Sequence, residues 1–282
     1  MSGSISYSYL PSLFSSSGSS ESSSLLNILY GSAGQSGLTG QNPVTALQFA
    51  EMNETKEVAA TAQEPQVARD VQAFRNAVAN AKDPASLLAN PAVLKVLLTA
   101  NGLSDQIPYS ALATKALLSN TNDSNSLVNQ LTDTRWKTVA QTFDFANKGL
   151  SVIQSPTIIN SLANGYAEVV WRQSLDQTTP GLSNALTFRS EASSITSVDQ
   201  ILGDPVMRTV VTTALGIPEQ IAFQDLTAQE QAISNRVDIK KFQDPKFVEN
   251  FVQRYLLAAS SSSTQTSTDL VSLAVQAQGL VV

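Results

Sequence analysis

The chain has 282 residues, a net charge of −6 and neither cysteine nor histidine. Lacking these two residue types, it has no disulfide bonds, thiol nucleophiles or Ser-His-Asp triads, and no zinc sites of the usual kinds. The acidic balance, with lysine and arginine scattered along the chain, argues against nucleic acid as a main partner.

Residues 1–41 are rich in serine, glycine and tyrosine and carry almost no charge. This composition predicts a flexible segment, and a Ser-rich start of this kind also suits export through a type III apparatus without cleavage. A basic region followed by an apolar one is not found there, so no classical signal peptide is expected. No apolar run approaches the roughly 18 residues that span a bilayer.

The ordered part is predicted to begin at Asn42-Pro43, where a capping residue precedes proline, and its first helix extends to about Thr61. A second helix after Pro65 carries one apolar stripe at helical spacing. Further helices are expected over 84–88, 91–101 and 109–118, and over the stretch that carries Trp136. Strand-like alternation never persists, so the fold class is predicted to be all-α.

The longest helical pattern opens at Ser155-Pro156 and closes near Thr179-Pro180-Gly181, which predicts a long central helix over about 155–178. In the following part, Thr227 and Glu230 have the spacing of a capping box. Residues 260–267 contain only Ser, Thr and Gln and predict a linker. A C-terminal amphipathic helix is then expected over 268–282. Its apolar stripe is the best candidate for partner docking and consists of Leu270, Leu273, Ala274, Ala277 and Val281.

A helical pattern occurs twice, at Leu88–Leu103 and 114 positions later at Leu202–Ile217. Each copy has an Asn or Asp cap, a proline, an apolar run and a glycine. The same offset carries Phe74-Arg75 onto Phe188-Arg189. The core over 42–259 is therefore predicted to contain two related helical modules, at about 65–147 and 182–259, joined by the central helix. The matched residues are interpreted as caps, stops and core positions, with each Phe packing and each Arg pairing with a carboxylate or capping a helix.

The sequence contains few candidates for chemistry. Large aromatic side chains can stack on sugar rings, and the candidates here are Trp136, Tyr166 and Trp171. Aromatic residues at helical spacing, however, usually belong to the hydrophobic core. Glu168 lies between two of them and is the one candidate general acid. No glycine-rich phosphate loop and no calcium-loop spacing occurs, so no cofactor, metal or small-molecule ligand is predicted.

Several sequence blocks resemble an alphaproteobacterial family of unknown function whose members are often described as flagellar proteins. The blocks include Leu87-Leu88-Ala-Asn-Pro91, Leu98-Thr-Ala-Asn-Gly102-Leu103, Leu131-Thr-Asp133-Thr-Arg135-Trp136 and Phe143-Asp-Phe145-Ala146, as well as Phe242-Gln-Asp244-Pro245-Lys-Phe247. The resemblance covers about Pro65–Leu257 and carries no catalytic residues. It implies a non-enzymatic structural or assembly protein of the bacterial flagellum.

The expected partners are other flagellar or assembly proteins, including copies of this chain. The chain is expected at the flagellum or exported without a cleaved signal peptide. Two alternatives remain open at this point: a helical peptidoglycan-cleaving enzyme that uses Glu168, and a cytoplasmic regulatory module that binds a partner.

Overall fold

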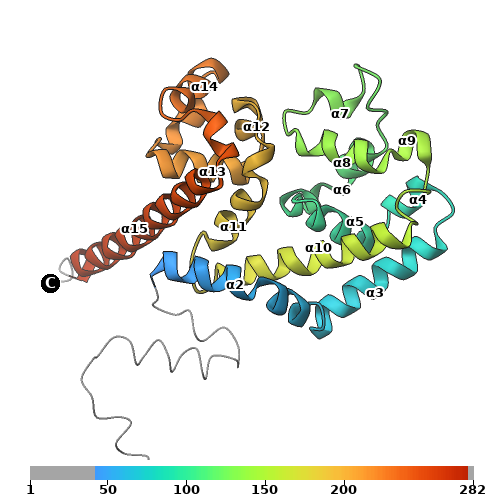
Figure 1. The fold of residues 1–282 in the computed structure, drawn as a ribbon, viewed down its shortest axis with the longest axis horizontal. Helices are drawn as coiled ribbons and strands as arrows, with labels where there is room; N and C mark the ends of the chain where they lie inside the picture. Colours follow the sequence, from blue (N-terminus) through green and yellow to red (C-terminus); the bar gives the residue numbers. More distant parts are fainter. Residues whose placement is uncertain (1–41, 279–282) are drawn as a thin grey trace, which may run out of the picture. The chain divides into compact units, whose positions relative to one another are not determined.

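The computed structural model describes the backbone of residues 42–278 and the side chains of residues 42–261, and its regular elements are all helices (Figure 1). The all-α prediction is confirmed. The predicted flexible segment 1–41 and the docking residue Val281 lie outside the described residues. Along the described helices, no stretch is both long and apolar enough to cross a membrane.

Local capping chemistry explains why the first helices begin where they do. Helix α2 (Pro43–Thr61) starts after Asn42, whose side chain accepts a hydrogen bond from the backbone of Val44 at 2.9 Å. Helix α3 (Pro65–Asn80) buries the apolar stripe predicted for it, including Phe74, which is fully buried. Both helices place proline at the first turn, where its missing N–H costs no hydrogen bond.

The helices that follow pack around one apolar core that also takes in side chains from α3 and from α10 (Pro156–Leu175). They include α5 (Pro91–Ala100), whose N-terminal cap is Asn90. Trp136 of α8 (Arg135–Phe143) is 1% exposed and lies in this core. The helices up to residue 148 are α4 (Pro84–Leu88), α5 (Pro91–Ala100), η3 (Ser104–Tyr109), α6 (Ser110–Leu117), α7 (Leu127–Gln130), α8 (Arg135–Phe143) and α9 (Phe145–Lys148).

Helix α10 (Pro156–Leu175) is the predicted central helix, and it connects the two groups of helices on either side of it in sequence. It packs on α5 and α3 of the first group, on α11 (Leu182–Glu191) of the second, and on α2. Helix α2 also contacts α11 and α15 (Pro245–Gln278), so α2 and α10 together form the main packed connection between the groups (Figure 1).

The second group has a core of its own, rich in phenylalanine. Phe188 of α11 is fully buried and contacts Phe242 edge-on, with ring centroids 5.3 Å apart, and Phe251 of α15 in a stacked geometry at 5.6 Å. The group consists of α11 (Leu182–Glu191), η4 (Ala192–Ser194), α12 (Val198–Gly203), α13 (Pro205–Leu215), η5 (Glu219–Phe223), α14 (Leu226–Ser234), η6 (Ile239–Gln243) and α15 (Pro245–Gln278).

The two matched sequence stretches have the same local design. The side chains of Asn90 and Asp204 cap α5 and α13. Gly102 and Gly216 follow the two helices with φ of 73° and 61°, in the left-handed region that favours glycine. The interpretation of these positions as caps and stops is therefore confirmed. The internal duplication itself stays a prediction.

The structure differs from the sequence predictions at three points. Helix α15 runs without a break from Pro245 to Gln278, so its backbone is helical through the predicted linker, and α15 rather than α10 is the longest described helix. The predicted capping box at Thr227 is wrong, because Asp225 caps α14 through the backbone of Ala228. A capping box does occur at Ser197, at the start of α12.

Candidate functional site

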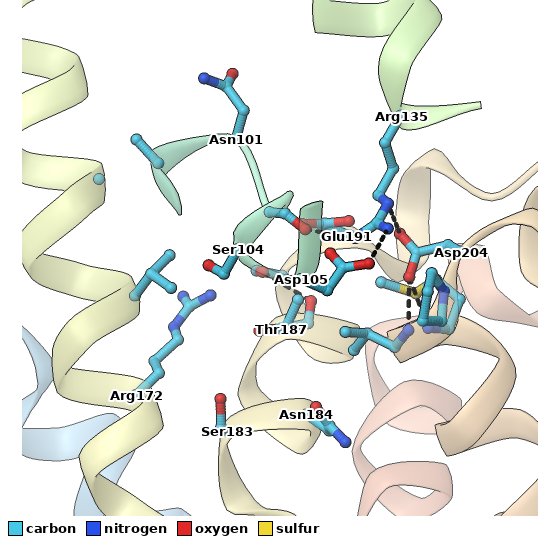
Figure 2. A pocket seen from close by; sticks show the side chains of 18 of the residues that line it. Asn101, Ser104, Asp105, Arg135, Arg172, Ser183, Asn184, Thr187, Glu191 and Asp204 are labelled. Carbon is cyan, nitrogen blue, oxygen red and sulfur yellow. Dashed lines mark hydrogen bonds and ion pairs between the residues drawn. The ribbon is translucent and has the colours of Figure 1, made fainter. Parts of the chain in front are cut away.

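The main candidate site is a cavity of about 740 Å³ to which helices α5, α8, α10, α11 and α13 contribute side chains. It lies between the first and second helical groups, and Figure 2 shows its polar lining. The charged residues that line it are Asp105, Arg135, Glu168, Arg172, Asp176, Glu191 and Asp204. At neutral pH the five carboxylates outnumber the two guanidinium groups.

Arg135 contacts acidic residues and a backbone carbonyl from several elements around the cavity. It begins α8, and its side chain is only 12% exposed. Its Nη2 lies 2.7 Å from Oδ2 of Asp133 and 3.3 Å from Oδ2 of Asp105, and its Nη1 donates to the backbone oxygen of Gly102. Its Nε lies 3.7 Å from Oδ2 of Asp204, the capping residue of α13, and therefore reaches the second helical group (Figure 2).

The environment of Arg135 favours its charged form strongly. Burial by itself would lower the pKa of Arg135, but the hydrogen bonds to Asp133 and the charges of Asp133, Asp204 and Asp105 outweigh burial and raise the pKa well above its usual range. The guanidinium therefore acts as a permanent cation that ties three aspartates and a carbonyl together.

The backbones of the two groups also approach each other closely beside Arg135. A Cβ atom at Gly203, the last residue of α12, would lie 2.8 Å from the backbone oxygen of Thr132. Real Cβ contacts are essentially never this short, so only glycine fits at this position. The close approach and the Arg135–Asp204 pair form a second link between the helical groups, separate from the one through α2 and α10.

Arg172 of α10 is the second cation of the cavity. The residue is 9% exposed, and its Nη2 donates to Oε1 of Glu54 on α2 at 3.0 Å and also pairs with Glu168, one turn earlier on α10. Its Nε is buried and has no hydrogen-bond partner in the described part of the chain. The ion pair with Glu54 fastens α10 to α2.

Glu191, at the end of α11, differs from the other carboxylates of the cavity because no hydrogen bond or ion pair to its side chain is found among the described residues. It is accessible from the cavity, but protein atoms surround it. This burial and the nearby charge of Asp204 raise its pKa, against the opposing effect of Arg172 and Arg135. Figure 2 shows Glu191 beside Arg135.

Asp176 has a structural task at the cavity wall. Its Oδ1 accepts a hydrogen bond from the backbone of Ser183 at 2.9 Å, in the first turn of α11. Burial raises the pKa of Asp176, although hydrogen bonds from the backbone of Ser183, Gly181 and Leu182 oppose this effect. Asp176 thus holds the turn between α10 and α11.

The residues that the sequence singled out for chemistry are mostly structural. Trp136, Tyr166 and Trp171 are 1%, 3% and 5% exposed, which confirms that they are core residues and leaves no ring face open for a sugar. Glu168 does line the cavity, with its carboxylate held by Arg172. The docking candidates Leu270, Leu273, Ala274 and Ala277 lie on α15, where side chains are not described.

The Phe-Arg pairs are also structural. Phe74 and Phe188 are both fully buried, as predicted. Arg189 lies 3.1 Å from Glu51 of α2 and 3.4 Å from Glu249 of α15, so it pairs with carboxylates as predicted. Arg75 instead donates to the side-chain amide oxygen of Asn160 at 2.9 Å.

A second, partly buried polar cluster lies in the first helical group, where Asp70 of α3 meets α5 and α10. Its Oδ2 accepts hydrogen bonds from Nζ of Lys95 and from the hydroxyl of Tyr166, each at 2.6 Å. Burial opposes ionisation of Asp70, but these hydrogen bonds outweigh burial and lower its pKa below the ordinary value. The cluster ties the three helices together.

Because the pKa of Asp70 is lower in the folded than in the unfolded chain, its contribution to stability is complete above the unfolded value of about 3.9. It is lost as the pH falls through the lower folded pKa. Asp70→Asn is therefore expected to reduce the free energy of unfolding by about 1 kcal/mol at pH 7, since Lys95 is partly exposed. The difference from the natural chain should shrink steadily below pH 4 in urea titrations. Glu57→Gln is the matched control, because this carboxylate lies within α2, is 42% exposed and among the described residues reaches only Lys56, at 4.0 Å. A difference independent of pH would contradict the expectation.

Sequence reasoning missed Asp204, Glu191 and Arg172 as members of one site. Asp204 was identified only as a helix cap, and nothing in its spacing from Arg135 indicates that the two meet. The available signal was the Asp133-Thr134-Arg135 block, which the resemblance had already singled out.

The chemistry of the cavity is dominated by ion pairs. Both cations and most of the carboxylates contact groups on other helices, which suits a site that fixes helix positions. Across the described residues, no three His, Cys, Asp or Glu side chains are grouped so that they could hold a metal ion.

Comparison with known proteins agrees with this architecture. The crystal structure of protein AGR_C_984 from Agrobacterium tumefaciens, a structural-genomics target, superposes with a TM-score of 0.66 over 76% of this chain and 91% of that one. The two are 24% identical, so the likeness concerns the fold alone. No curated protein matches the chain. The family model described as "Protein of unknown function (DUF1217)" matches residues 100–248, which are just over half of the chain and include every residue that lines the cavity. This chain therefore belongs to the DUF1217 family.

Proposed function

We propose that the chain is a non-enzymatic structural or assembly component of the bacterial flagellum, exported without a cleaved signal peptide and docking through its terminal segments. The flagellar part of the proposal is supported by the resemblance of the sequence blocks around Pro91, Arg135 and Pro245 to proteins described in that way. Its partners would be flagellar or assembly proteins, including further copies of the chain.

The ion pairs that Arg135 and Arg172 form between helices support the structural part of the proposal. Arg135 spans from α8 to η3 and α13, and Arg172 spans from α10 to α2. The one candidate for a catalytic acid, Glu168, forms an ion pair with Arg172 one turn further along α10, so its side chain belongs to the same network of contacts. Cations placed in this way brace a rigid body, which is what a subunit of a mechanical assembly requires.

Mass spectrometry of flagella isolated from the natural host is expected to detect this chain, and its amount should fall when flagellar assembly is blocked. Deleting residues 1–41 should leave a stable protein inside the cell and remove it from the culture medium, because the Ser-rich segment would be the export signal. A cytoplasmic marker protein controls for lysis. Finding the chain only in the cytoplasm, with an unchanged distribution after the deletion, would contradict the proposal and favour a regulatory module.

A further inference from the structure

A second, smaller hollow lies in the second helical group, away from the cavity described above. It has a volume of about 220 Å³, and its apolar lining includes Leu215 of α13 with Phe247 and Phe251 of α15. An apolar cavity of about 150 Å³ is known to accept a benzene ring. The hollow is therefore large enough for one aromatic side chain.

Three cations surround this hollow: Arg236, Lys241 and Arg254. Each is exposed, and none forms an ion pair with a described carboxylate. The single acidic residue of the lining, Asp238, uses its side chain to cap η6 through the backbone of Lys240 at 3.0 Å. In a chain with a net charge of −6, this basic rim is a local reversal of charge.

The same helical group exposes an apolar knob of the opposite electrostatic character. Phe223, at the end of η5, is 88% exposed, the highest value for a large apolar residue in the described part of the chain, and Leu226 at the start of α14 is 57% exposed. Glu219 and Asp225 flank these two residues, are exposed, and pair with no described cation. An exposed Phe–Leu pair of this kind marks an interaction surface more often than a lone apolar residue does.

We propose that the Phe223 knob of one copy of the chain binds in the basic hollow of a second copy. Phe223 does not fill the hollow of its own chain, because it is almost fully exposed and does not line that hollow. The match is both steric and electrostatic: an aromatic ring with two carboxylates meets an apolar floor with three cations that form no ion pair with a described carboxylate. One of these cations, Lys241, lies over the ring of Phe247, with Nζ 5.7 Å from the ring centroid. Aromatic and arginine residues are the types that dominate the energetics of protein interfaces.

The knob and hollow are different surfaces, so two arrangements satisfy the contact. In a two-fold dimer each knob fills the other hollow, and in a head-to-tail arrangement each copy uses its knob on the next. In either case, the charge pairs at the rim attract the two copies, and salt screens this attraction. Association should therefore become slower and weaker as salt is added, and the dissociation constant at low and high salt measures the effect. The proposal deepens the assembly role suggested above, but it is tested on purified protein, so its failure would leave the flagellar location untouched.

The test is self-association of the full chain, measured by analytical ultracentrifugation over a concentration series. The natural chain should associate, and Phe223→Ala and Arg254→Glu should each weaken association by about tenfold or more. Met52→Ala, which removes an apolar side chain that is 78% exposed on α2, and Lys137→Glu, which reverses an exposed charge on α8, should change nothing. Circular dichroism checks that every variant is folded.

Mixing the two interface variants gives the sharper result. The Arg254→Glu chain keeps its knob and the Phe223→Ala chain keeps its hollow, so one intact contact remains between them, and the mixture should associate more tightly than either variant alone. A natural chain that stays monomeric at all concentrations would overturn the proposal. Association that survives both substitutions, or a mixture no tighter than its parts, would overturn it as well.

Discussion

Replacing Arg135 with alanine is expected to lower the free energy of unfolding by about 3 kcal/mol, the low end of the range for breaking a buried ion pair. The side chain is 12% exposed, and its removal leaves the carboxylates of Asp133 and Asp204, themselves 19% and 10% exposed, without their cation. It also leaves the carbonyl oxygen of Gly102 without its donor. Urea-induced unfolding followed by circular dichroism measures the change.

Two further variants separate the causes. Arg135→Lys keeps the charge but loses the planar fork that reaches several acceptors at once, so it should recover only part of the lost stability. Lys137→Ala removes an exposed cation two residues further along α8 and should change stability by less than about 0.5 kcal/mol. Equal stability of the Arg135→Ala and Lys137→Ala variants would mean that the cluster contributes nothing to the fold.

The starts of several helices and their buried faces could be predicted because both depend on residues close together in sequence. Asn42, Asp83, Asn90 and Asp204 each precede a proline, and each caps the helix that follows through contacts two or three residues away. Apolar spacing likewise places the buried residues of α3 on one face. These features depend on a single turn of chain, so the sequence contains all that is needed to find them.

The errors in the local predictions occur where neighbouring residues favour a different structure. Serine and threonine have only weak preferences against helix, so the 260–267 stretch continues the helix that precedes it. Thr227 has the spacing of a cap, but Asp225 lies where the chain turns into α14 and makes the bond instead. In the first case the helix already formed before residue 260 continues through it, and in the second a better-placed capping residue precedes Thr227.

The cavity could not be predicted for a different reason, because its residues meet only in the folded molecule. Arg135 and Asp204 are far apart in sequence and belong to different helical groups, and their meeting depends on how α2 and α10 place those groups. Glu168 was identified from its aromatic neighbours, but its partner Arg172 was not recognised, although it lies one helical turn away. A search for charge pairs at helical spacing would have found that pair, and it would have weakened the case for Glu168 as an acid from the start.

The core of the second helical group is expected to be the most sensitive part of the molecule to truncation. Phe188→Ala should lower the free energy of unfolding by about 4 kcal/mol, because it removes a fully buried ring from the centre of a phenylalanine cluster and leaves a cavity. The ring contacts both Phe242 and Phe251, so edge-to-face and stacked contacts are lost together with the buried area. Chemical denaturation with constant slope for both proteins gives the difference directly.

Phe223→Ala is the matched control, since it makes the same chemical change at a side chain that is 88% exposed, and it should shift stability of the monomer by no more than about 0.5 kcal/mol. The pair therefore separates two uses of one residue type within the same helical group: Phe188 for holding the fold and Phe223 for meeting another molecule. If Phe188→Ala were as mild as Phe223→Ala, the second group would not depend on its phenylalanine core. The rigidity that a structural subunit needs would then have to come from the ion pairs of the cavity, and the Arg135→Ala variant would reveal it.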